Sequence, residues 1–251
     1  MWLTLCSSSD TPALWAHHSL RTQGLEPLEL VTTEMLGQGV RWEHRLGIKG
    51  ASINLTLSDG REIRSESIRG VLNRVTWIPT EHLPYVHLTD REYSIQEFLA
   101  FFSSWLYAFP RPVLNRPRPP GLSGQLRHIT EWIWMASRVG LHISDYEQTS
   151  VNLVPEIAFE GRCSPTNAPI NTVIVVSGHV IASKAPSDVR EKCRRLADLA
   201  RTELLGIEFS EGAESPWTFV GATTLPDLRL GGQAVLDKLM LVLRGETGEK
   251  R

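Results

Sequence analysis

The sequence has few cysteines, and their spacing matches no common metal site. Cys6, Cys163 and Cys193 are odd in number and far apart, and the chain contains no C-x-x-C motif and no Cys/His spacing of a zinc site. The eight histidines also lack the spacing of metal ligands. The cysteines are therefore predicted to be reduced thiols, and no metal site is expected from them.

A long apolar segment and a strong net charge are also missing. No apolar run approaches the roughly 18 residues that span a bilayer, and residues 1–6 contain no basic stretch of the kind that begins a secretory signal. The formal net charge of −2 provides no overall field that would attract nucleic acid or anionic lipid. We therefore expect a cytoplasmic protein that binds neither membranes nor nucleic acid.

What is present is the composition of an ordinary globular protein, with 41% hydrophobic and 22% charged residues. A chain of 251 residues forms one large domain or two small ones, and we favour two. Between residues 110 and 120, five prolines are interspersed with Arg111, Arg116 and Arg118, which is typical of a stiff basic connector. The predicted domains are residues 1–120, including this connector, and residues 121–251.

The beginning of the chain has the pattern of a β-α-β unit. Residues 2–6 are apolar, residues 7–10 supply a turn and a helix cap, and Pro12 suits the first helical turn, where no backbone N–H donor is needed. Gly24 fits the left-handed position after the helix, and residues 28–31 form a second apolar run. This pattern predicts two parallel strands joined by a helix.

Periodicity predicts further hairpins and helices. Residues 52–57 alternate apolar and polar side chains, and Asp59-Gly60 then precedes residues 61–63, which indicates a hairpin with a tight turn. A second hairpin is predicted around Ser177-Gly178. The predicted helices cover residues 90–109, 123–139 and 187–205, and the remaining predicted strands cover residues 68–72, 207–209 and 217–220, with a last helix after residue 232.

Three stretches together resemble the ATP-grasp superfamily, especially its carboxylate-amine and peptide ligases. Residues 68–74, the helix that follows and residues 113–117 resemble the end of the family's amino-terminal domain. Residues 136–143 resemble the entry into its central domain, where a helix ends at a Gly-Leu turn. Residues 173–220 resemble the carboxy-terminal half of the ATP-grasp core in the order and spacing of their elements.

The resemblance implies an α/β protein in which a Rossmann-like pre-ATP-grasp domain precedes a reduced α+β ATP-grasp-like domain. In the family, a small antiparallel sheet that carries lysines covers the nucleotide phosphates. Residues 144–170 occupy the corresponding place here, and they contain no lysine. Several strands of about five or six residues, with their turns, do not fit in this length. The second domain is therefore expected to lack the full lid subdomain.

The resemblance also implies a magnesium site, built from an acidic residue after the 187–205 helix and a Glu-x-Asn on the next strand. Glu208 keeps the first carboxylate, but Gly221 and Thr223 stand at the other two positions. Asn171 stands where the family places an arginine that contacts the phosphates. Because phosphoryl transfer depends on cations that neutralise and position the phosphates, we expect catalysis to be lost and no cofactor to be required.

Several polar residues are candidate ligands for a bound group. Asn73 and Arg74 end a strand at the carboxyl edge of the predicted sheet, where open α/β sheets bind ligands. The alternative for Arg74 is an interdomain salt bridge or a cap. Arg116 is a candidate for an acidic partner, and its alternative is a solvated linker.

The other candidates are Glu208, Asp227 and Arg229. Glu208 is the carboxylate that remains of the implied metal site. Asp227 and Arg229 lie in the turn before the last helix, where the family's active-site edge would be, and a structural turn is their alternative. No catalytic residue and no metal ligand is assigned.

Three hypotheses of function follow from these observations. In the first, the chain is a catalytically degenerate accessory protein that binds a peptide or a partner enzyme in peptide modification or biosynthesis. In the second, it is an active ATP-dependent carboxylate-amine or peptide ligase that holds Mg-ATP with unusual ligands. In the third, it is a homodimeric scaffold with an exposed tryptophan at its contact, because Trp132 and Trp134 lie two apart on a helix and cannot share one face.

Overall fold

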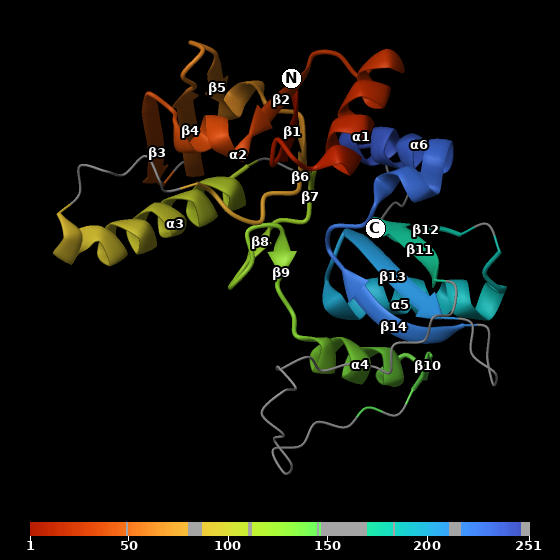
Figure 1. Cartoon of the computed structure of the whole chain (residues 1–251). Coiled ribbons are helices and arrows are strands. Elements are labelled where there is room, and N and C mark those ends of the chain that lie inside the picture. The colour runs from red at the N-terminus through yellow and green to blue at the C-terminus, as the bar shows by residue number, and fades with distance from the viewer. Residues whose placement is uncertain are drawn as a thin grey trace. The chain divides into compact units, whose positions relative to one another are not determined.

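The computed structural model describes residues 1–48, 50–79, 87–109, 112–144, 146, 170–182, 184–210 and 217–246. They form a mixed α/β structure (Figure 1) that divides into two compact units. The first unit comprises Met1–Leu126 and Asp227–Arg251, and the second comprises Arg127–Pro226. Each unit has its own buried apolar cluster.

This division differs from the predicted boundary at residue 120. Residues 113–125 belong to the first unit, because β7 (Val113–Leu114) pairs with its main sheet and β8 (Pro117–Arg118) pairs with β9 (Gly124–Gln125). The last helix, α6 (Gly232–Leu243), also belongs to the first unit, and the Leu243 carbonyl accepts a hydrogen bond from Trp2 Nε1 at 2.9 Å. Arg111, part of the expected connector, lies outside the described residues.

The main sheet of the first unit is parallel and has the order β2-β1-β6-β7. Asp10 caps the helix between β1 and β2, since its Oδ1 accepts a hydrogen bond from Ala13 N at 3.1 Å, and Gly24 has a φ of +87° after that helix. The predicted β-α-β unit is therefore confirmed. The elements around this sheet are β1 (Trp2–Cys6), α1 (Thr11–Thr22), β2 (Leu28–Thr32), α2 (Thr33–Gly37), η1 (Ser65–Ser67), β6 (Gly70–Asn73) and η3 (Leu228–Gly231).

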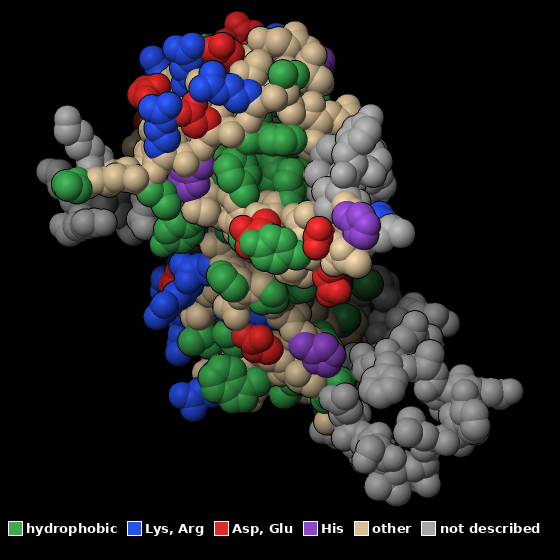
Figure 2. All heavy atoms as spheres, turned by 90° about the vertical axis from the view of Figure 1, so that its left-hand side faces the viewer, with side chains coloured by type: hydrophobic (Ala, Val, Ile, Leu, Met, Phe, Trp, Pro, Cys, Tyr) green, Lys and Arg blue, Asp and Glu red, His purple; other side chains and the backbone are tan. Residues whose placement is uncertain are grey.

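A smaller antiparallel sheet of β3 (Arg41–Gly47), β4 (Gly50–Thr56) and β5 (Glu62–Arg64) completes the first unit. The predicted β4–β5 hairpin is confirmed. β3 was not predicted, because its many charged residues leave only a weak alternation of apolar and polar side chains. One face of the sheet packs on α3 (Arg91–Tyr107), which follows η2 (Leu88–Asp90). Figure 2 shows basic and acidic side chains interleaved at the top of the face that it displays.

The described strands of the second unit form a sheet in the order β10-β14-β13-β11-β12. Among these strands, β10 and β14 are parallel and the other neighbours are antiparallel. Val173, Val175 and Ile207 of this sheet pack with Cys193 and Leu196 in one cluster that is shielded from solvent. The elements are α4 (Ile129–Arg138), β10 (His142–Ile143), β11 (Ile170–Val176), β12 (His179–Ile181), α5 (Ser187–Ala200), β13 (Leu204–Ser210) and β14 (Thr218–Thr223).

Two helices of the second unit are shorter than predicted. α4 begins at Ile129 instead of residue 123, because residues 124 and 125 form β9 and His128 caps the helix. α5 ends at Ala200, because Arg201 adopts a left-handed conformation with a φ of +51° and Leu204 begins β13. The hairpin around Ser177-Gly178 is confirmed as β11 and β12.

Two expectations meet the described residues only in part. Most of residues 144–170, on which the reduced lid was predicted, lie outside them, as does Cys163. Within the described part of the chain, no helix is both long and apolar enough to cross a bilayer.

Trp132 is buried in the second unit, while Trp134 is 56% exposed.

The two described cysteines test the packing of both cores. Cys6 and Cys193 are fully buried, and burial raises the pKa of each thiol to about 12. In a Cys163→Ser variant we expect neither thiol to react with iodoacetamide at about pH 8, since only about one thiol in ten thousand is ionised there. Mass spectrometry with and without urea checks this, and labelling of either cysteine in native buffer contradicts the packing.

Candidate functional site

The candidate site lies at the carboxyl ends of β1 and β6 in the first unit. These strands are adjacent and parallel, so the loops that follow them leave the sheet at the same edge. β2 lies on the other side of β1, and the order of the sheet therefore reverses between β1 and β6. In open α/β sheets this reversal is the usual place for a ligand.

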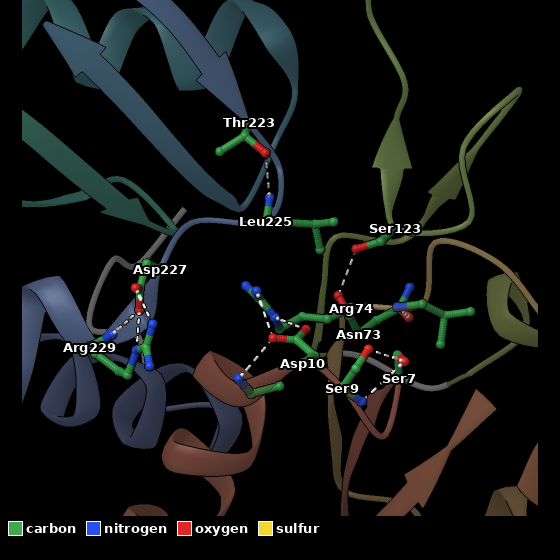
Figure 3. A network of polar contacts seen from close by, with 12 residues as sticks. Ser7, Ser9, Asp10, Asn73, Arg74, Ser123, Thr223, Leu225, Asp227 and Arg229 are labelled. Carbon is green, nitrogen blue, oxygen red and sulfur yellow. Dashed lines mark hydrogen bonds and ion pairs between the residues drawn. The ribbon is translucent and has the colours of Figure 1, made fainter. Parts of the chain in front are cut away.

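A buried ion pair joins the two loops at this position. Arg74 Nε lies 2.8 Å from Asp10 Oδ2, and Arg74 Nη2 lies 3.2 Å from Asp10 Oδ1 (Figure 3). The side chains are 3% and 14% exposed, respectively. The Arg74 amide also donates to the Leu5 carbonyl at 2.8 Å, which fixes the backbone from which this guanidinium extends. The pair is bidentate and mostly withdrawn from water, so it holds the loops after β1 and β6 together.

Asp227 and Arg229 form a second ion pair in the same unit. Arg229 Nη2 lies 2.6 Å from Asp227 Oδ2, and Arg229 Nε lies 2.8 Å from Asp227 Oδ1. The carboxylate also accepts a hydrogen bond from the Arg229 amide at 3.1 Å and thereby caps η3. The hydrogen bonds from the Arg229 side chain and amide, together with the charges of Arg229 and Arg74, hold the pKa of Asp227 below its ordinary value of 3.8.

The two ion pairs form one group of four charges. The positive charge of Arg74 contributes to the lowered pKa of Asp227, and the negative charge of Asp10 contributes to the raised pKa of Arg229. Each guanidinium already faces a carboxylate, and the four charges sum to zero. An added phosphate would therefore have to compete with a carboxylate for either guanidinium, whereas a ligand with mixed charge or a polar peptide would not need to displace one.

Asn73, another predicted ligand, is used inside the protein. Its side chain is fully buried, and its Nδ2 donates to the carbonyls of Asn115 and Leu122, both at 2.8 Å. Its Oδ1 accepts from Val75 N at 3.2 Å, and Ser123 Oγ donates to its carbonyl at 2.7 Å. Asn73 thus joins the end of β6 to the segment after β7, and its amide faces protein.

Arg116 is half-buried and contacts the end of α3. Its Nη1 donates to the Tyr107 carbonyl, and its guanidinium lies 5.9 Å from the centroid of the Tyr107 ring. These contacts give it a structural role in the segment that the sequence had suggested to be a linker. Arg118 of the same segment lies in β8.

Glu208 belongs to the second unit and is half-buried on β13. The strand register places Gly221 of β14 opposite it on one side and Thr172 of β11 on the other. Thr223 lies opposite Gly206, and its Oγ1 accepts a hydrogen bond from Leu225 N at 3.1 Å. The positions that the resemblance assigned to magnesium are thus close together on adjacent strands, but only Glu208 carries a carboxylate.

Sequence reasoning missed the role of Asp10 as the partner of Arg74. It had assigned residues 7–10 to a turn and a cap, and the cap is present, but the same carboxylate also neutralises the arginine. The signal was available, because an acidic residue after β1 and a basic residue after β6 must come together if those strands are adjacent and parallel. Among the described residues, no group of three or more His, Cys, Asp or Glu side chains is placed to hold a metal ion.

No protein-family model matches the sequence, and no curated protein is significantly similar to it. Solved structures are similar over nearly the whole chain. A Chryseobacterium gregarium RiPP-associated ATP-grasp ligase, in complex with ADP and a leader and core peptide, has a TM-score of 0.74 at 12% identity and covers 99% of this chain and 97% of its own. The macrocyclase MdnC of Microcystis aeruginosa, bound with the precursor peptide MdnA, has a TM-score of 0.70 at 9% identity over 96% and 99% of the chains. The chain has the ATP-grasp fold.

A further ATP-grasp structure is less similar. D-alanine-D-alanine ligase from Aeromonas hydrophila has a TM-score of 0.52 at 14% identity and covers 99% of this chain and 100% of its own. The resemblance inferred from residues 68–117, 136–143 and 173–220 is thus confirmed at the level of the fold. At such identities the ATP-grasp fold does not by itself specify an activity, because one fold carries sites of different chemistry.

The ion pair between Asp10 and Arg74 is expected to contribute strongly to stability. Replacing Arg74 with Met leaves a buried carboxylate without its partner, and we expect Arg74→Met to lower the free energy of unfolding by about 3–5 kcal/mol. The double variant with Asp10→Asn should recover part of this loss, because the amide oxygen still caps α1 and no charge is stranded. Urea denaturation followed by circular dichroism measures these changes.

Arg229→Met is the matched control for that experiment, since it makes the same substitution in a pair that is half exposed to solvent. We expect a much smaller change there. Equal losses for Arg74→Met and Arg229→Met would show that burial of the Asp10–Arg74 pair does not decide its strength.

The lowered pKa of Asp227 predicts how the stability of the first unit depends on pH. A carboxyl whose pKa falls on folding stabilises the native state above its unfolded value, and this contribution disappears as the pH falls through its folded pKa. Wild type should therefore be more stable than Asp227→Asn near pH 7, and the difference should vanish well below about pH 4. Thermal melts across this range measure it, and a difference that persists in acid contradicts the assignment.

Proposed function

We propose that this chain is a peptide-binding protein of the ATP-grasp fold that serves as an accessory factor in peptide modification and does not itself catalyse ligation. The observation that carries the proposal is the pairing of charges at its polar site. Arg74 and Arg229 each face a carboxylate at 3.2 Å or less. In the second unit, Glu208 lies opposite Gly221.

The peptide part of the proposal is supported by the structures that share the fold. The Chryseobacterium ligase holds a leader and core peptide, MdnC holds the precursor peptide MdnA, and the ATP-grasp ligase PsnB is complexed with a minimal precursor. PsnB has a TM-score of 0.68 at 16% identity over 98% of both chains. Peptide binding is thus common among structures that this chain resembles over almost its entire length.

The residues present do not fit Mg-ATP. Octahedral magnesium prefers several oxygen ligands that include carboxylates, and the adjacent positions on β13 and β14 supply Glu208 together with a glycine and a threonine. Residues 144–170 contain no lysine that could neutralise a phosphate. A triphosphate bound here would keep most of its charge uncompensated, which disfavours both binding and transfer.

The first test measures nucleotide binding and turnover. Isothermal calorimetry of the full chain with Mg-ATP should give no saturable heat, and a coupled assay should detect no ADP, with or without added peptide. The D-alanine-D-alanine ligase from Aeromonas hydrophila, which shares the fold, is the positive control in the same buffer. Saturable binding and ADP release that Glu208→Gln abolishes would overturn the proposal in favour of an active ligase.

The second test addresses the peptide. We expect selection from a library of random short peptides to enrich related sequences, and synthetic copies should bind the full chain saturably with dissociation constants of roughly micromolar order. Sequence-scrambled copies serve as the control. Failure to enrich any sequence that binds above its scrambled copy would refute peptide binding.

A further inference from the structure

We propose that the free edge of β2 binds an extended peptide by strand addition, with an acidic side chain of that peptide facing Arg21. This inference rests on the proposed peptide-binding function and assigns it a site on the first unit. It concerns backbone groups of β2 and one arginine of α1, and it does not involve the charges of Asp10, Arg74, Asp227 and Arg229.

The backbone of β2 presents hydrogen-bonding groups away from the sheet. Among the strands that the structure describes, β2 lies at the edge of its sheet and pairs with β1 alone. The Pro27 carbonyl accepts from Trp2 N at 2.8 Å, so residues 27, 29 and 31 point their backbone groups toward β1. The alternate residues point outward, and Arg61 Nη1 accordingly donates to the Leu30 carbonyl from the open side. The backbone N–H and carbonyl groups of Leu28 and Leu30 therefore face the open edge.

These outward groups are available to a second strand. No described residue hydrogen-bonds to the outward N–H and carbonyl of Leu28 or to the N–H of Leu30. Arg61 blocks only the Leu30 carbonyl, and its contact is long at 3.3 Å, because the same guanidinium is held by Glu29 at 2.8 Å and Asp59 at 2.7 Å. An edge with unpaired donors and acceptors is a template for an extended chain.

The surface beside this edge is hollowed. A depression of about 650 Å³ runs along β2. An extended peptide in this depression would have its alternate side chains on the two sides of the β2 edge. The depression is lined by His17 and Arg21 of α1, residues 26–30 at β2, Met35 of α2 and Arg61 before β5.

Arg21 sets the expected charge of the peptide. Its side chain is about half exposed (55%), and it forms a long ion pair with Glu26, whose Oε1 lies 4.0 Å from Arg21 Nη2. On the other side of the edge, Arg61 is already held by Glu29 and Asp59. An acidic side chain on the α1 side could therefore approach Arg21 in place of the long, exposed contact with Glu26, whereas Arg61 on the opposite side already has two close carboxylate partners.

The test uses the full chain and a capped synthetic peptide, Thr-Val-Glu-Val-Thr. Hydrogen exchange by NMR should show that saturating peptide slows exchange of the Leu28 and Leu30 amides. The Glu29 and Val31 amides already bond to β1 and serve as internal controls, so their exchange should not change. If the peptide binds without slowing exchange of the Leu28 and Leu30 amides, the edge assignment is wrong. The same conclusion follows if millimolar peptide slows the exchange of no amide. In both cases the proposal that the chain binds peptides still stands.

Two sets of variants make the test specific. N-methylation of a peptide residue whose amide faces β2 should weaken binding about fivefold, since each lost hydrogen bond contributes about 1 kcal/mol, whereas methylation of the alternate residues should not. Arg21→Ala should weaken the Glu peptide severalfold and leave a Gln version unchanged. Arg64→Ala, on β5 in a pair with Glu62, is the control substitution. Equal effects of both methylation patterns, or of Arg21→Ala on both peptides, would contradict strand addition.

Discussion

The buried contact between Asp10 and Arg74 is the interaction on which the polar edge of the first unit depends. It joins the loops after β1 and β6, which are distant in sequence, and one carboxylate both caps α1 and neutralises the arginine. A lone buried charge is costly, so the removal of either residue would leave the charge of the other without compensation. The place where an open α/β sheet commonly binds a ligand is thus occupied by the protein's own side chains.

Other residues that the sequence predicted to bind a ligand also have partners within the protein. The Asn73 amide donates to the carbonyls of Asn115 and Leu122, and Arg116 contacts the carbonyl and ring of Tyr107. Glu208 differs, because its neighbours across the sheet have no charge to offer it. The chain thus has the ATP-grasp fold, but Asn73 and Arg116 have structural contacts and Glu208 has no carboxylate opposite it. For this reason we propose a binding role in place of catalysis.

Local signals in the sequence were sufficient for much of the fold. The β-α-β unit followed from apolar runs, a capping aspartate and Gly24, and both hairpins followed from turn dipeptides. These are short-range effects that a few neighbouring residues determine. α5 was predicted too long because Leu204 and Leu205 continue the apolar pattern of the helix, while pairing with β11 draws them into β13. That competition depends on a strand distant in the chain, so periodicity could not resolve it.

The site was harder to predict for the same reason. Arg74 and Asp227 could be recognised as charged residues at strand and helix ends, but the partners that neutralise them depend on which residues the fold brings together.

α6 illustrates this on a larger scale. The chain returns to its first unit after Pro226, so the second unit is a segment inserted within the first. A protein shortened just before Asp227 would keep the complete sequence of its second unit and lose part of its first, and a nonsense mutation near the 3′ end of the gene would therefore damage the portion encoded at the 5′ end.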